Sequence, residues 1–151
     1  MKLAEALQER ADLRRKIDML AERLTNNSLV QEGDLPAEDP VELLKELDGA
    51  VTRLEELVAA INKTNSATVV DGCSVTEMLA RKDCLGLKIS ILRKLVSRTG
   101  SPQGRYSRSE IRYVRVVDVA ELQREADGLA RELRLVDNAL QRANWDTDLI
   151  Q

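Results

Sequence analysis

Apolar residues recur along this chain at alternating steps of three and four residues, in four separate stretches. This spacing, about 3.5 residues on average, gathers the apolar side chains in a narrow seam along one side of an α-helix. Four seams of similar length predict four helices packed as a bundle. In chain order, the seam positions are Leu3, Ala6, Arg10, Leu13, Ile17, Leu20 and Leu24; Leu44, Leu47, Val51, Leu54, Val58 and Ile61; Val75, Met78, Lys82, Leu85, Ile89, Leu92 and Val96; and Val119, Leu122, Ala126, Leu129, Leu133, Val136, Leu140 and Ala143.

Capping residues set the starts of three of these helices. Asp39 and Pro40 suit the N-cap and the first position of the second helix. Ser74 opens the third helix and Asp118 the fourth, each followed three residues later by a glutamate that completes a capping box. The predicted helices cover residues about 3–24, 40–62, 75–97 and 119–144, which leaves irregular segments at 27–39 and 98–117.

One irregular segment has the composition of a strand. Residues about 111–117 are mostly β-branched or aromatic. An isolated strand is unstable, so its partner is expected to be Leu29 and Val30, the 103–107 segment, or the same segment of another subunit. The predicted fold class is mainly α, a single domain over 1–151: an antiparallel, coiled-coil-like four-helix bundle with a short β segment between the third and fourth helices.

Short connections between helices also predict where the irregular parts of the chain lie, because consecutive helices then run antiparallel. The N-terminus, the turn at 63–73 and the C-terminal tail are expected to meet at one end of the bundle. Segments 27–39 and 98–117 are expected to share the opposite end.

Two seam positions carry a cation where an apolar residue is expected, Arg10 and Lys82. Either one meets a carboxylate, a ligand or a neighbouring subunit inside the bundle, or its stem packs in the seam while its charge reaches water. A polar seam residue can also fix helix register and oligomeric state.

Basic residues gather around the 98–117 segment, with Glu110 as the sole acidic residue among them. We call them the basic cluster: Arg93, Lys94, Arg98, Arg105, Arg108, Arg112 and Arg115. Three interpretations stay open. The cluster pairs with acidic residues of the 27–39 loop (Glu32, Asp34, Glu38 and Asp39) or of another subunit, it binds an anion or a nucleic acid, or it does neither.

The composition removes most catalytic chemistry. The chain has no histidine and only two cysteines, Cys73 and Cys84, which excludes histidine-based catalytic triads and the common zinc sites. Its glycines form no phosphate-binding loop. We therefore expect a protein that is not an enzyme and that binds no cofactor and no metal.

The bulk numbers favour long, solvated helices in a reduced compartment. Aromatic residues are 2% and charged residues 32% of the chain, and the net charge is −3. The sparse cysteines and the absence of an apolar leader predict a cytoplasmic protein. No stretch has the composition of a membrane span.

Six segments, most of them in loops or at helix ends, carry further motifs: 1–7, 30–40, 61–65, 105–111, 117–119 and 141–145. Their combination resembles the septicolysin-like family of small, largely uncharacterised bacterial proteins. The resemblance covers essentially the whole chain and implies no catalytic residues. The name of that family implies a pore-forming, membrane-active protein, which is the alternative function.

The leading interpretation is a non-enzymatic, self-associating assembly or adaptor protein. We expect a homo-oligomer that binds a protein, a nucleic acid or a phosphate group at the 98–117 segment. A membrane has no part in this interpretation.

Overall fold

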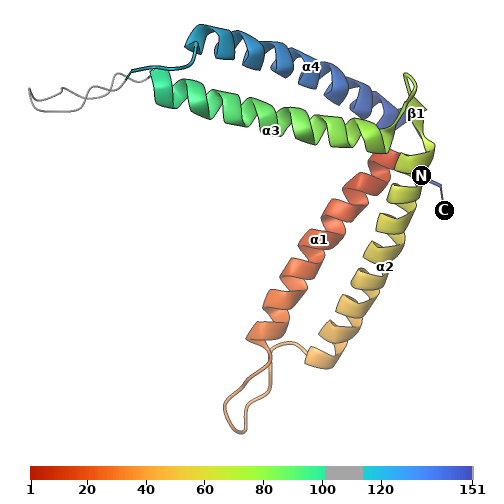
Figure 1. The fold of residues 1–151 in the computed structure, drawn as a ribbon. Helices are drawn as coiled ribbons and strands as arrows, with labels where there is room; N and C mark the ends of the chain where they lie inside the picture. The colour runs from red at the N-terminus through yellow and green to blue at the C-terminus, as the bar shows by residue number, and fades with distance from the viewer. Residues whose placement is uncertain (101–113, 151) are drawn as a thin grey trace, which may run out of the picture. The chain divides into compact units, whose positions relative to one another are not determined.

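A computed structural model of the protein describes residues 1–100 and 114–150. The elements follow the order α1 (Leu3–Asn26), α2 (Pro40–Ala67), β1 (Val69–Val70), β2 (Cys73–Ser74), α3 (Val75–Gly100) and α4 (Val119–Asp146) (Figure 1). The mainly helical fold class is confirmed, and the helix packing is compatible with a bundle. Each helix begins where the sequence predicts and continues past its predicted end.

The short β segment lies elsewhere than predicted. Of the predicted strand at 111–117, residues 111–113 lie outside the described residues, and 114–117 form no strand. Instead β1 and β2 pair antiparallel between α2 and α3. Asp71 and Gly72 turn the chain with positive φ angles of 51° and 84°. An Asp-Gly pair adopts this tight hairpin turn readily, whereas β-branched composition alone supplies no pairing partner.

The chain divides into two compact units. Met1–Val75, with the C-terminal residues from Gln141, forms the α1/α2 unit, and Thr76–Leu140 forms the α3/α4 unit. We describe each unit by itself, so the single domain remains a prediction. The shared end for segments 27–39 and 98–117 also remains a prediction, because these segments belong to different units.

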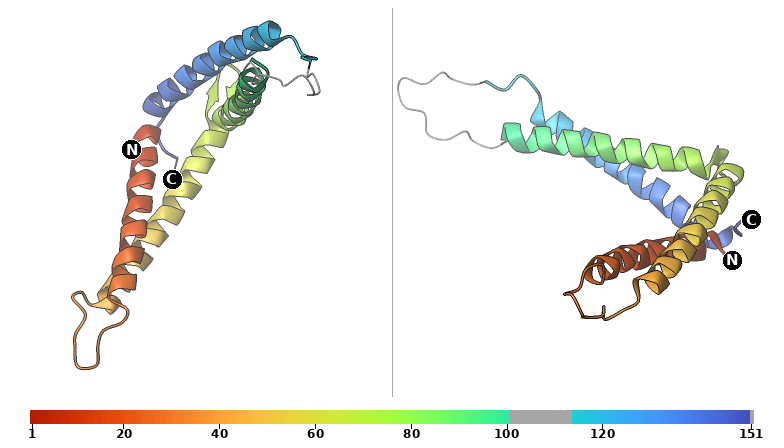
Figure 2. Two further views of the ribbon diagram at one scale, coloured as in Figure 1. Left: turned by 90° about the vertical axis from the view of Figure 1, so that its left-hand side faces the viewer. Right: turned by 90° about the horizontal axis from the view of Figure 1, so that it is seen from below.

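In the α1/α2 unit the two helices run antiparallel and approach closely. Their Cα atoms come within 8 Å of each other, and the helices lie side by side in both views of Figure 2. The core of this unit is Leu3, Ala6, Leu57 and Ile61, each exposed by 1% or less. The predicted seam of α1 is confirmed, since none of its residues is fully exposed.

The predicted seam of α2 is wrong at alternate positions. Leu43, Ala50 and Leu57 are buried, whereas their neighbours Leu44 and Val51 are 49% and 46% exposed. At these points two apolar residues are adjacent in the α2 sequence, so spacing alone did not show which of the two series of positions is buried against α1. The buried series of positions contains the small residue Ala50, which permits the close approach of α1.

Both ends of the chain meet the end of α2, in what we call the terminal clasp. The Leu3 N–H donates to the Thr147 carbonyl and the Leu149 N–H donates to the Met1 carbonyl, each at 2.9 Å. The Ile150 N–H donates to the Thr64 hydroxyl oxygen, also at 2.9 Å. The predicted meeting of the N-terminus, the 63–73 region and the C-terminal tail is therefore confirmed.

The α3/α4 unit is a second antiparallel helix pair, held at a wider separation than the first. Its predicted seams are confirmed: Met78, Leu85, Ile89 and Leu92 of α3 are buried, as is Ala126 of α4. Ion pairs border this seam. They join Arg81 to Glu132, Lys82 to Asp137 and Lys88 to Glu125.

Candidate functional site

The described part of the basic cluster lies on the last turns of α3. Arg93, Lys94 and Arg98 are exposed there, and Arg115 is exposed shortly before α4 begins. The other three members of the cluster, Arg105, Arg108 and Arg112, lie outside the described residues. The structure therefore brings together three of the predicted site residues on one helix.

The cations along α3 differ in their partners. The first three, Arg81, Lys82 and Lys88, each pair with a carboxylate of α4. Among the residues that the structure describes, none forms a hydrogen bond or an ion pair with Arg93, Lys94 or Arg98. The C-terminal half of α3 therefore presents positive charge that no described residue of its own unit neutralises.

Arg93 and Lys94 border a shallow groove of about 480 Å³ along α3. Small residues make up part of its lining: Gly86, Ser90 and Ser97 of α3 line it together with Ile89 and with Leu133 of α4. A Cβ built on Gly86 would meet nothing within 4 Å, so the groove is open at that point. The arrangement can accept an extended anionic group along α3, with the two cations at its edge.

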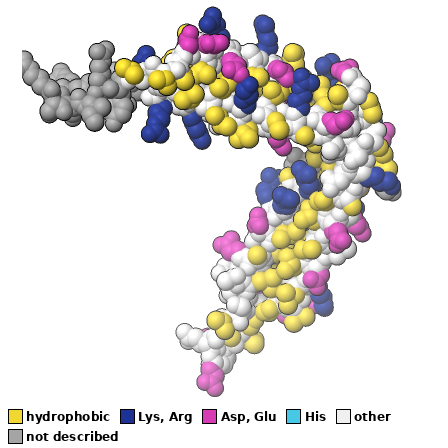
Figure 3. All heavy atoms as spheres, viewed as in Figure 1, with side chains coloured by type: hydrophobic (Ala, Val, Ile, Leu, Met, Phe, Trp, Pro, Cys, Tyr) yellow, Lys and Arg dark blue, Asp and Glu magenta, His cyan; other side chains and the backbone are white. Residues whose placement is uncertain are grey.

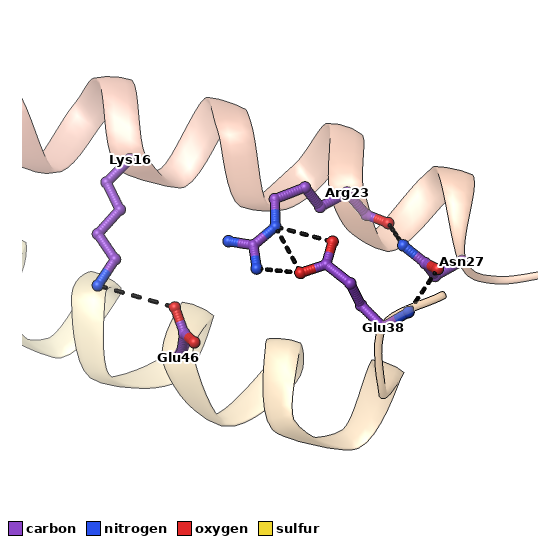
Figure 4. Close-up of polar contacts among 5 residues, drawn as sticks. All are labelled: Lys16, Arg23, Asn27, Glu38 and Glu46. Atoms are coloured by element: carbon purple, nitrogen blue, oxygen red, sulfur yellow. Dashed lines mark hydrogen bonds and ion pairs between the residues drawn. The ribbon is translucent and has the colours of Figure 1, made fainter. Parts of the chain in front are cut away.

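One of the acidic residues expected to pair with the basic cluster, Glu38, has a partner within its own unit. Glu38 pairs instead with Arg23 of α1, whose Nε lies 3.0 Å from a Glu38 carboxylate oxygen (Figure 4). The Glu38 N–H also donates to the Asn27 side-chain oxygen at 3.0 Å, and Lys16 lies 3.9 Å from Glu46 nearby. These contacts hold the end of the loop against α1.

The Arg23–Glu38 pair shifts both titrations. The hydrogen bond from Arg23, together with its charge, lowers the pKa of Glu38, and partial burial opposes this shift. The same hydrogen bond raises the pKa of Arg23. Glu38 is therefore occupied within its own unit.

The two cationic seam residues differ from each other. Lys82 pairs with Asp137, and the two side chains are 39% and 40% exposed. Lys82 thus meets a carboxylate, as one interpretation predicted, at the solvent edge of the seam. Arg10 is half-buried and forms no ion pair with any residue in the ranges 1–100 and 114–150.

Sequence reasoning missed a larger cavity, of about 610 Å³, beside the terminal clasp. It is lined by Met1, Arg53, Glu56, Leu57, Ala59, Ala60, Lys63 and Leu149. Its main cation is already neutralised, because Arg53 donates to Glu9 at 2.7 Å and to Glu56 at 3.4 Å. The hydrogen bond from Arg53 to Glu9 is the main cause of the raised pKa of Arg53. Ala59 and Ala60, two small residues in succession, were the signal for this cavity in the sequence.

Within the described ranges, no group of three acidic or cysteine side chains is placed to hold a metal ion. Cys73 and Cys84 are free, exposed thiols. Over the same residues, no helix is both long enough and apolar enough to cross a membrane.

The described residues form two helix pairs with exposed charges, a groove along α3 and a cavity beside the terminal clasp. The sequence model of a family of unknown function, DUF6847, matches residues 10–149, and the chain belongs to this family. The chain is also similar to a functionally unknown conserved protein from Corynebacterium diphtheriae. That crystal structure shares 42% identity over 99% of each chain, with a TM-score of 0.92. No curated protein matches.

These findings overturn the resemblance to the septicolysin-like family. Neither the family match nor the solved structure points to it. The motifs that suggested it lie mostly at helix ends and in loops, where capping and turn residues recur among unrelated helical proteins. The pore-forming alternative rested on that resemblance and is withdrawn with it.

Proposed function

We propose that the protein is a non-enzymatic, self-associating assembly or adaptor protein that binds a phosphate-bearing partner through the last turns of α3. The supporting observation is the contrast along α3, where Arg93, Lys94 and Arg98 are exposed and without described partners, and the first two line an open groove. Arginine and lysine side chains in such an arrangement favour phosphate oxygens. The absence of histidine from the sequence supports a non-enzymatic role.

Binding of a fluorescent single-stranded oligonucleotide, measured by anisotropy over a series of salt concentrations, tests this proposal. Each neutralised phosphate contributes a slope of about −0.7 in log K against log salt for a single strand. The triple variant Arg93→Ser/Lys94→Ser/Arg98→Ser is expected to bind more weakly. It should also flatten the slope by about 2.

A matched control removes the same charge from another surface. Arg124, Arg131 and Arg134 of α4 are exposed and have no described ion-pair partner, so their triple serine variant carries the same net charge. It is expected to bind nearly as well as the unmodified protein. Equal loss in both triple variants, or no binding by the unmodified protein, contradicts a phosphate site on α3.

An acidic peptide of glutamates serves as the second probe. If it binds with the same dependence on Arg93, Lys94 and Arg98 while the oligonucleotide does not bind, the partner is an acidic protein and the phosphate assignment is wrong. Self-association is tested separately by the molar mass from light scattering, since either part of the proposal can fail without the other.

A further inference from the structure

The helix α3 carries a second apolar stripe in addition to its seam. Leu87, Ile91 and Leu95 follow one another at steps of four residues and are 64%, 56% and 37% exposed. Residues advance by about 100° around a helix, so this stripe lies roughly opposite the seam that faces α4. Yellow hydrophobic side chains are visible on the surface over this unit in Figure 3. A helix that is apolar on opposite sides is normally covered on both.

Two unpaired charges border the same side of this stripe. Asp83 and Lys94 are both exposed, and neither has an ion-pair partner among the described residues. They are separated along the helix by about 16 Å, so they cannot pair with each other. Asp83 lies toward one end of the stripe and Lys94 toward the other. An antiparallel second copy would therefore place each charge beside the opposite charge of its partner.

A single alignment of two antiparallel copies brings the apolar residues together and also brings the opposite charges together. Leu87 then lies opposite Ile91 of the partner subunit, and Asp83 lies beside Lys94 of the partner subunit. Cys84 lies beside Leu95 of the partner subunit. All of these pairs are centred at or next to Ile89. A parallel alignment would instead bring each charge against its own kind, which is destabilising.

We propose that a second copy of this chain packs antiparallel against the outer face of α3, with a two-fold axis that crosses this face at the level of residue 89 along the helix. The inference rests on the proposed self-association and specifies its interface. A two-fold interface of this kind uses the same surface on both subunits. Lys94 then belongs both to the interface and to the groove, and Arg93 lines the groove without taking part in the interface.

A disulfide trap tests this geometry. The variant Cys73→Ser/Leu95→Cys retains Cys84, and under mild oxidation we expect a covalent dimer that links Cys84 of each copy to position 95 of the other. The two positions on one helix are about 16 Å apart, whereas a disulfide joins Cα atoms less than about 7 Å apart, so the link must be intermolecular.

Two controls accompany the trap. Cys73→Ser alone retains Cys84, and its covalent dimerisation would reveal a different alignment of the two copies and overturn the proposal. Cys73→Ser/Arg131→Cys places a thiol on an exposed position of α4 and is expected to form no specific dimer at the same oxidant concentration.

Light scattering of the reduced proteins supplies the second measurement. Leu87→Ser/Ile91→Ser is expected to raise the dimer dissociation constant by roughly a hundredfold. Asp83→Lys should raise it by roughly tenfold, and Asp83→Lys/Lys94→Asp should restore it, because the double variant re-forms both charge pairs.

The outcomes separate this inference from the proposed function. A protein that self-associates but is neither trapped through position 95 nor weakened by Leu87→Ser/Ile91→Ser overturns the interface and leaves self-association standing. A strict monomer overturns both. A monomer that loses folding stability when Leu87 and Ile91 become serine would show that the same chain covers this face.

Discussion

The two helix pairs are built on the same seam pattern but bury different shares of their surface. In the α1/α2 unit, the fully buried Ala6 and the nearly buried Ala50 face a narrow interhelical space. In the α3/α4 unit, longer side chains such as Leu85 and Leu92 separate the helices, and ion pairs border the gap. The α1/α2 helices are thus in close contact, and the α3/α4 helices lie farther apart with ion pairs along the edges of their seam.

The terminal clasp is the second difference between the units. In the α1/α2 unit, the C-terminal tail adds Leu149 to the core and a hydrogen bond to Thr64. No described segment of the α3/α4 unit covers the outer face of α3 in the same way. A two-helix seam alone therefore leaves apolar surface exposed, and in the α1/α2 unit the C-terminal tail covers part of it.

The largest expected effect is on the core of the α1/α2 unit. Leu57→Ala removes a side chain that is 1% exposed, and should lower the free energy of unfolding by about 2–5 kcal/mol through lost burial and a residual cavity. Urea denaturation followed by circular dichroism measures the loss.

Leu87→Ala on the outer face of α3 is the matched control. Leu87 is 64% exposed, so the variant is expected to change the free energy of unfolding of the monomer by less than about 1 kcal/mol. If Leu57→Ala and Leu87→Ala lowered the free energy of unfolding equally, the contrast between the core of the α1/α2 unit and the outer face of α3 would be wrong.

The terminal clasp is tested by Thr64→Val, a change of nearly constant shape. The hydroxyl of Thr64 accepts from the Ile150 N–H and donates to the Ala60 carbonyl at 2.8 Å. Its loss leaves the Ile150 N–H without this acceptor and should cost about 1–3 kcal/mol. Hydrogen exchange at the Ile150 amide should accelerate in the same variant.

Thr25→Val provides a comparison at an exposed site. Thr25 makes the same kind of hydroxyl bond, to the Ala21 carbonyl at 2.9 Å, but accepts no bond from the tail. It should change stability by a few tenths of a kcal/mol at most. A loss as large as that of Thr64→Val would mean that the clasp contributes nothing specific.

The smallest effect concerns pH and the Arg23–Glu38 pair. Because Arg23 lowers the pKa of Glu38 in the folded protein, the pair contributes stability above the ordinary glutamate pKa. That contribution is lost as the pH falls through the lowered pKa. Glu38→Gln should therefore show a shallower loss of stability in acid. A carboxyl titration of Glu38 by NMR that shows no downward shift contradicts this account.

The sequence predicted the helices well and their packing only in part. Helix starts at Pro40 and Val75 follow from local capping chemistry, which a single sequence displays directly. The buried face of α2 could not be predicted in the same way, because the choice between Leu43 and Leu44 depends on how closely another helix can approach. The β hairpin was missed although its Asp71-Gly72 turn is a strong local signal.

The sequence predicted the cluster of basic residues at the candidate site, but it did not predict the partners of the cations along α3. Arg93, Lys94 and Arg98 stand out in the sequence. Only the structure shows that the preceding cations of α3 have carboxylate partners, whereas these three have none among residues 1–100 and 114–150. Which carboxylates lie across a helix pair depends on tertiary register. Glu38, an expected partner, was instead taken by Arg23 of its own unit.

The terminal clasp also affects how this polypeptide can be rewired. Lys2 and Asp148 are neighbours in an isolated β-bridge, so a short peptide linker could join these two parts of the chain. The chain could then be reopened in the 27–39 loop as a circular permutant, with every helix retained intact.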